Sequence, residues 1–276
     1  MVINSAMRVR SLETICLSWL VAAAGCGGSS KQATGLGGAV TLATQAGGSS
    51  GTLSGYFGEF DPSTVDANPC NGSEYDPCCL VPRGNGMALN SPLVFPSLLE
   101  FMGAGSLSVT DKTTGESMGA VEPGSSQSYL SSALGAWATG DTLSLSAKGG
   151  DFPSFSGSIQ TPPALAGVNP LLIPGASGSE VLNIPTNANF SVSWTPDANT
   201  DEVLGTIGGA TSSVLVCYGH QSDGHVTFPT ALMAAQADTQ SQLALIRTRW
   251  TTVAGASSST VAVGATVELA TNVSLH

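Results

Sequence analysis

The sequence of 276 residues is poor in charge, and most of the charge that it carries is negative. Only 10% of its residues are Asp, Glu, Lys or Arg, compared with about 25% in a typical globular protein. Eight Lys and Arg residues against 19 Asp and Glu residues give a formal net charge of −11 at pH 7. A surface this acidic repels phosphates and anionic lipid headgroups. The composition therefore excludes nucleic-acid binding and attachment to an anionic membrane surface.

The amino-terminal region lacks an apolar run long enough to cross a membrane. The run of residues 15–21 is about half of the ~20 apolar residues that a transmembrane helix needs. Arg8 and Arg10 precede the run, and small residues at 22–25 follow it. A basic start, a short apolar run and a small-residue end are typical of a secretory signal peptide. We therefore expect residues 1–25 to be a signal peptide.

The sequence Ala-Ala-Gly-Cys at residues 23–26 resembles the lipobox of bacterial lipoproteins, although Ala23 stands where that family usually has Leu. The resemblance implies that a fatty acid such as palmitate is attached to Cys26 and anchors the exported chain to the cell envelope. Gly27 in place of Asp favours the outer membrane if the host is Gram-negative. The Gly- and Ser-rich residues 26–49 are then expected to form a flexible linker. An ordinary cleaved signal with an incidental cysteine is the alternative.

Cysteine is scarce, and four of the six cysteines remain after the predicted signal and lipid site: Cys70, Cys78, Cys79 and Cys217. In an oxidising compartment they can form up to two disulfides with three connectivities. Because neighbouring cysteines are poorly placed to bridge each other, we expect Cys70 to pair with Cys78 or Cys79, and the other to pair with Cys217. A zinc site is the alternative, although the spacing lacks paired C-x-x-C ligands.

Apolar and polar residues alternate with a period of two along most of the chain. Such alternation is typical of strands with one face in a core and one in water. Gly, Pro, Asn and Asp clusters separate the segments, as in β-sandwiches. Only residues 230–240, which follow Pro229, have a helical composition. We therefore expect an all-β fold with at most one short helix. Clear alternating segments are residues 106–110, 143–147, 190–194 and 261–269.

A Pro- and Gly-rich segment at residues 161–178 divides the alternating segments into two groups. We expect a first β module over residues 50–162, which carries the disulfide loop, and a second over residues 163–276. The second module, with Trp194 and an apolar strand around Cys217, resembles immunoglobulin-like or fibronectin-like β-sandwich modules. It lacks the paired inter-sheet cysteines of antibody domains, and the likeness of pattern says nothing of function. A single larger sandwich is the alternative.

Histidine is also scarce, which leaves few residues for acid–base or metal chemistry. Beyond the predicted signal there are only His220, His225 and His276. The Asp-Gly dipeptide at residues 223–224 predicts a two-residue hairpin turn, which would bring His220 and His225 to one face. There they would bind a metal ion or supply acid–base chemistry. Alternatively, they are solvated residues of the turn.

Residues 197–201 have the D-x-N-x-D opening of a calcium-binding EF-hand loop. The loop requires Gly at its sixth position and Glu at its twelfth, where this chain has Glu202 and Gly208. The segment is therefore not an EF-hand. A looser calcium site is one hypothesis, and an acidic connecting turn is the other. The ligands of the calcium site would be Asp197, Asn199, Asp201 and Glu202.

Aromatic residues accompany the acidic, cysteine-containing segment of residues 59–76. Rigid aromatic side chains supply contact area at little entropic cost, so a loop held by disulfides is a candidate surface for a protein or glycan ligand. The alternative is a cover over one end of a sandwich. The aromatic candidates are Tyr56, Phe57 and Tyr75.

No catalytic residue is assigned. The G-x-S-x-G string at residues 47–51 lacks the strand before it and the helix after it that a hydrolase nucleophile requires. The leading hypothesis is a non-enzymatic, surface-displayed lipoprotein with a binding, adhesion or envelope-structural role, and with no cofactor unless calcium binds. The alternative is a secreted carbohydrate-active or other hydrolase, whose two carboxylates would converge only in the fold, about 5–10 Å apart.

Overall fold

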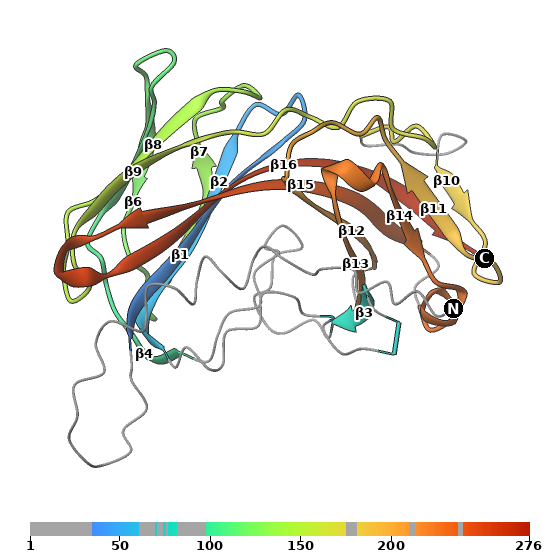
Figure 1. The fold of residues 1–276 in the computed structure, drawn as a ribbon, viewed down its shortest axis with the longest axis horizontal. Helices are drawn as coiled ribbons and strands as arrows, with labels where there is room; N and C mark the ends of the chain where they lie inside the picture. Colours follow the sequence, from blue (N-terminus) through green and yellow to red (C-terminus); the bar gives the residue numbers. More distant parts are fainter. Residues whose placement is uncertain are drawn as a thin grey trace, which may run out of the picture. The chain divides into compact units, whose positions relative to one another are not determined.

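Figure 1 shows the computed structural model of the chain. It describes residues 35–60, 70, 74–75, 77–81, 98–174, 181–209, 213–236 and 240–276. The chain divides into two units, Met1–Gln32 and Ala33–His276, and all described residues belong to the second. These residues form a β-sandwich fold, which confirms the all-β prediction. The predicted signal peptide and Cys26 lie outside the described residues.

The largest sheet has ten strands, and its two longest lie next to each other at its centre. These are β15 (Gln240–Ala254) and β16 (Thr260–Leu275), which pair antiparallel. On one side of them follow β12 (Glu202–Gly208), β13 (Val214–His220) and β3 (Cys78–Val81). On the other side follow β1 (Gly35–Gln45), which is parallel to β16, then β2 (Gly51–Phe60) and β4 (Leu98–Phe101). In addition, β7 (Tyr129–Leu134) pairs with β2, and β10 (Leu182–Ile184) pairs with β16.

Two smaller sheets supply further strands. One has the order β6 (Ser117–Val121), β5 (Leu107–Asp111), β8 (Thr142–Ala147) and β9 (Phe155–Gln160). The other pairs β11 (Phe190–Ser193) with β14 (His225–Phe228). Their alternating sequences explain their positions: in β8, Leu143, Leu145 and Ala147 are buried between more exposed neighbours. Each small sheet thus has an apolar face to bury against the large one.

The odd-numbered residues of β16 connect two hydrophobic clusters. Val261 and Val263 belong to a first cluster with apolar residues of β1, β2 and the four-stranded sheet. Val273 and Leu275 belong to a second cluster with residues of β12, β13 and the two-stranded sheet. A third cluster includes the even-numbered Ala270. Because successive residues of a strand point to opposite faces, the large sheet packs apolar side chains on both faces.

The predicted strands are present with small shifts of their ends, and two other predictions change. Residues 35–45, expected within the linker, form β1, where Val40 and Leu42 are fully buried. Residues 39–44 are all buried, so packing on both faces of the strand outweighs the Gly-rich composition. The helix expected over residues 230–240 is the single turn α2 (Thr230–Met233). In the part of the chain that the structure describes, no helix is long and apolar enough to span a membrane. The division at residue 162 stays a prediction, although the large sheet contains strands from both ranges.

Candidate functional site

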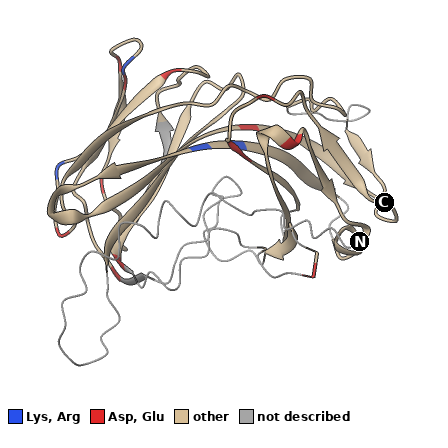
Figure 2. Cartoon of the chain, in the orientation of Figure 1, with Lys and Arg blue, Asp and Glu red and all other residues tan. Residues whose placement is uncertain are grey.

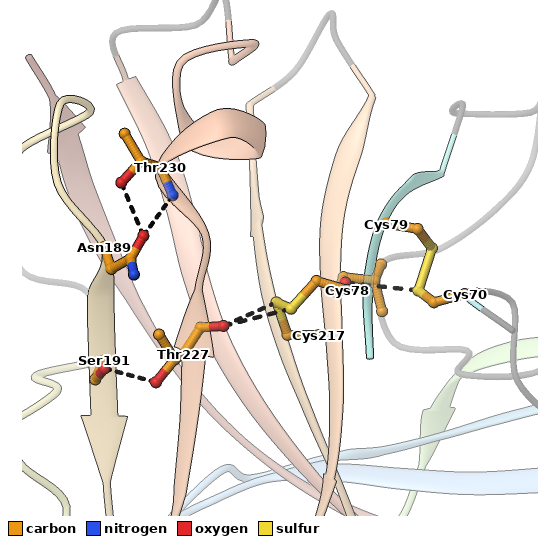
Figure 3. Close-up of a disulfide and its surroundings, with 9 residues drawn as sticks. Cys70, Cys78, Cys79, Asn189, Ser191, Cys217, Thr227 and Thr230 are labelled. Atoms are coloured by element: carbon orange, nitrogen blue, oxygen red, sulfur yellow. Dashed lines mark hydrogen bonds between the residues drawn. A yellow bond between two sulfur atoms is a disulfide. The ribbon is translucent and has the colours of Figure 1, made fainter. Parts of the chain in front are cut away.

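Two disulfides involve the edge strand β3, and one of them bonds it to β13 of the large sheet (Figure 3). Cys78 lies directly opposite Cys217 in the register of β3 and β13, and the two are bonded. Cys79, the next residue, points to the other face and is bonded to Cys70. The adjacent cysteines therefore serve opposite faces of the sheet, because a strand alternates with period two. The predicted pairing is confirmed, and the structure decides which adjacent cysteine takes which partner.

The Cys78–Cys217 bridge also packs against the two-stranded sheet. The sulfur atoms of Cys78 and Cys217 lie 3.3 and 3.6 Å from the carbonyl oxygen of Thr227 in β14 (Figure 3). Thr227 in turn shares a hydrogen bond of 2.7 Å with Ser191 across to β11. The bridge therefore lies inside the second cluster, at the junction between two sheets.

A buried ion-pair cluster lies where β12 begins and β15 passes beside it. The Asp201 carboxylate accepts a hydrogen bond of 2.8 Å from Nε of Arg247. Nε and Nη2 of Arg249 donate to the same carboxylate at 2.8 and 2.9 Å. In Figure 2, blue segments of β15 lie beside red segments of the chain around β12. Arg247 is only 1% exposed, so its charge is compensated inside the protein and not by water.

Asp197 forms the outer edge of this cluster. Its carboxylate accepts a 3.0 Å hydrogen bond from Nη2 of Arg247, and a 2.9 Å bond from the Asn199 backbone N–H. Burial alone raises the pKa of Asp197, but these two partners outweigh it and lower the pKa below its ordinary value. The carboxylate is therefore held in its charged form.

In this geometry, carboxylate oxygens that a calcium ion would need accept hydrogen bonds from arginine. Asp197 and Asp201 bind arginine, and Glu202 points to the opposite face of the sheet because it follows Asp201 in the extended chain. Asn199 contributes its backbone N–H to the turn. Among the residues that the structure describes, no group of three or more His, Cys, Asp or Glu is arranged to hold a metal ion.

On the opposite face, Glu202 links two aromatic side chains from neighbouring strands. Its Oε2 accepts a 2.8 Å hydrogen bond from Nε1 of Trp250 in β15, and its carboxylate also accepts from the hydroxyl of Tyr218 in β13. Burial, together with the Glu202 charge and hydrogen bond, raises the pKa of Tyr218, so this hydroxyl keeps its proton. His220 packs edge-on against Tyr218, with ring centroids 6.0 Å apart. We name Trp250, Glu202, Tyr218 and His220 the aromatic patch.

The predicted histidine hairpin is wrong. A 3-10 turn over Gln221–Asp223 follows β13, and His225 begins β14, which pairs with β11 and not with β13. The Asp223 carboxylate accepts the His220 backbone N–H at 2.7 Å, and Gly224 adopts a left-handed φ of 70°. The Asp-Gly turn thus redirects the chain into another sheet. His220 is half-buried beside Tyr218, whereas His225 is exposed.

The aromatic recognition surface expected near the cysteines is also corrected in part. Phe57 is fully buried, with its ring 4.9 Å from that of Phe152 and 5.5 Å from that of Tyr129. Tyr56 is 7% exposed and points to the opposite face. Tyr75 forms an isolated bridge with Cys78 and packs on the second cluster. The acidic residues 61–69 lie outside the described residues.

The sequence analysis missed Arg247, Arg249 and Trp250. A signal was present: two of the eight basic residues lie two positions apart in an otherwise apolar and Thr-rich segment. At that spacing both arginines share one face of a strand, and a buried face requires acidic partners. Trp250 follows Arg249 directly, so its side chain lies on the opposite face of the strand.

No protein-family model matches the sequence, and no curated protein matches it. A solved tetra-tandem repeat from the extending region of a large adhesion protein is 16% identical, with a TM-score of 0.25, over 86% of this chain and 50% of that one. A 1.5-MDa bacterial ice-binding adhesin is 17% identical, with a TM-score of 0.19, over 87% and 66%. Fibronectin(III)-like modules of Clostridium thermocellum CbhA are 9% identical, with a TM-score of 0.20, over 86% and 94%. The chain thus spans half the length of the adhesion-protein repeat.

Proposed function

We propose that the chain is a non-enzymatic, surface-displayed lipoprotein whose β-sandwich has a binding or adhesion role. The observation that carries the binding role is the aromatic patch. Trp250 and Tyr218 are both only partly buried, yet both are fixed by hydrogen bonds to one carboxylate. Rigid aromatic side chains at a surface give contact area at low entropic cost, which is what a binding surface needs.

Export is supported by the two disulfides. Disulfides persist in oxidising compartments and are rare in the reducing cytosol. Cys70, Cys78, Cys79 and Cys217 are all bonded, which fits a chain that folds after export. Attachment of lipid at Cys26 is proposed on the signal-like residues 1–25 and the lipobox-like sequence that ends them.

A non-enzymatic role is supported by the state of the converging carboxylates. Asp197 and Asp201 meet at Arg247, but the Asp197 carboxyl, whose pKa is lowered, is not suited to donate the proton that a glycosidase acid must supply. Glu202, on the other face, accepts hydrogen bonds from two aromatic donors. These contacts favour a binding protein over a hydrolase.

The test uses living cells. Intact cells that produce the chain are expected to expose it to added protease and to adhere to coated surfaces, while deletion of the gene removes both signals. A Cys26→Ser variant is expected to leave the membrane fraction and to be soluble without detergent. In the deletion strain it is expected to restore neither adhesion nor protease-sensitive display. The proposal fails if the wild-type chain is protected in intact cells, or if deletion leaves adhesion to protein- and polysaccharide-coated surfaces unchanged.

A further inference from the structure

Trp250 differs from the two other tryptophans that the structure describes. Trp137 and Trp194 are 6% and 4% exposed and belong to the first and second hydrophobic clusters. Trp250 is only partly buried and belongs to none of the three clusters. Its indole therefore contributes little to the packing of the core, and its partial exposure calls for another explanation.

The indole of Trp250 covers Gly264 on the neighbouring strand β16. A Cβ atom at position 264 would lie 2.6, 2.8 and 2.9 Å from three adjacent carbons of the six-membered ring, Cζ3, Cη2 and Cε3. Nearly equal distances mean that Gly264 meets the face of the ring and not its edge. One face of the indole thus lies on the backbone of the sheet, and the ring is parallel to the sheet surface. Any larger residue at position 264 would displace it.

The carboxylate of Glu202 holds the indole by a hydrogen bond from Nε1, at the edge of the ring. Trp250 lies on β15 opposite Gly264 of β16, and Glu202 of β12 lies opposite Thr248, two residues earlier on β15. Nε1 of Trp250 donates to Glu202 at 2.8 Å, so the ring is in contact with β16 on one side of β15 and hydrogen-bonded to β12 on the other. Tyr218 donates to the same carboxylate. A carboxylate has about four acceptor positions, so Glu202 retains acceptors for a ligand.

We infer that the aromatic patch binds a neutral saccharide, with one pyranose ring stacked on the outer face of the Trp250 indole. A pyranose ring has a face of C–H groups, which packs on an aromatic face, and a rim of hydroxyls, which donate to acceptors such as the Glu202 carboxylate. The inference rests on the binding role proposed above and specifies its ligand.

The surroundings favour this ligand over a peptide or an anionic sugar. The even-numbered neighbours next to the indole are polar: Thr248 and Thr266, which are 2% and 0% exposed, share a hydrogen bond of 3.2 Å. A peptide anchor needs a desolvated apolar pocket, and these threonines do not supply one. A net charge of −11, together with the Glu202 carboxylate at the patch, repels uronic acids and sulfated sugars.

The test is affinity electrophoresis of the full chain, purified from membranes in detergent, through gels that contain a soluble neutral glucan, mannan, galactan or xylan. Hyaluronate serves as the anionic probe and gelatin as the polypeptide probe. At least one neutral polysaccharide is expected to retard the wild type, and hyaluronate and gelatin are not. Trp250→Ala is expected to weaken that binding about tenfold or more, and Trp250→Phe, which keeps a ring but loses the indole donor, by less. Leu130→Ala removes an apolar side chain that is 74% exposed on the same sheet and is expected to bind as the wild type does.

Each other outcome overturns the inference. It is wrong if none of the four neutral polysaccharides retards the wild type, if gelatin or hyaluronate alone does, or if Trp250→Ala binds as tightly as the wild type. If Trp250→Ala does not fold, the other two variants decide. The inference is then refuted if Trp250→Phe binds the polysaccharide as tightly as the wild type and Leu130→Ala loses binding. Wild-type cells that still adhere when the purified chain binds no neutral polysaccharide would refute the saccharide site and leave the proposed adhesion role standing.

Discussion

Replacing Asp201 with Asn is expected to lower the free energy of unfolding by about 3–5 kcal/mol, the usual cost of removing one partner of a buried ion pair. The Asp201 side chain is 5% exposed and that of Arg247 is 2% exposed. The variant leaves the Arg247 charge inside the protein with only the more exposed Asp197 at 3.0 Å. Asn has nearly the size of Asp, so the loss measures charge and not packing.

Asp197→Asn is the matched control, because it changes the same chemical group beside the same arginine. The Asp197 side chain is 37% exposed, so water already screens it, and removing its charge is expected to cost about 1 kcal/mol or less. Burial therefore decides the difference between the two variants.

The assay is urea denaturation at pH 7, followed by tryptophan fluorescence and analysed by linear extrapolation. The denaturant slope has to agree between the variants and the wild type for the free energies to be compared. The pKa of Asp197 is lowered in the folded protein, so its contribution is present above the ordinary pKa of Asp and is lost as the pH falls through the folded value. The cost of Asp197→Asn should accordingly disappear in acid. Equal losses for the two variants at pH 7 would refute the assignment of Asp201 to a buried pair.

Three further predictions follow from other parts of the fold. Thiol titration of the denatured, unreduced chain should find no free thiol among residues 27–276. Cys217→Ser should lower the free energy of unfolding by up to roughly 5 kcal/mol in the chain-entropy model, because its bridge spans a sequence separation of 139. Recovery of Cys217 as a free thiol by peptide mapping would contradict both expectations. Glu268 is 3% exposed, and burial raises its pKa. Its ionisation is therefore unfavourable in the folded protein, and the free energy of unfolding falls as the pH rises through the folded pKa. Glu268→Gln should stabilise the chain at pH 8 and not at pH 4, and an equal effect at both pH values would count against a buried ionised carboxyl. Gly264→Ala should displace the Trp250 indole and change its fluorescence while leaving the disulfides intact, whereas an unchanged emission spectrum would show that the ring does not cover Gly264.

Much of the fold could be predicted because alternation is local. Leu143, Leu145 and Ala147 are buried as their period of two requires, and the same rule sends Cys78 and Cys79 to opposite faces. Local composition failed where both faces of a strand are buried. Residues 35–45 are rich in Gly, but residues 39–44 are all buried, and this packing decided for a strand.

The candidate site shows where sequence reasoning stops. An Asp-Gly dipeptide predicts that the chain turns at residues 223–224, but it cannot say whether β14 returns beside β13 or joins β11 in another sheet. The acidic residues 197–201 predict either a loose calcium site or a connecting turn, and local sequence does not reveal their arginine partners, of which Arg247 lies 50 residues beyond Asp197.

By itself, the sequence determined the all-β class and the face on which most strand residues lie, since these depend on neighbours one or two positions away. It also limited the disulfides to four cysteines. Only the tertiary structure decided that Cys78 meets Cys217, that Asp201 meets Arg247, and that Trp250 covers Gly264. The physical reason is that period two sets the face of a side chain, whereas strand order and register set what lies beside it. Strand order and register in turn depend on how both faces of the large sheet pack.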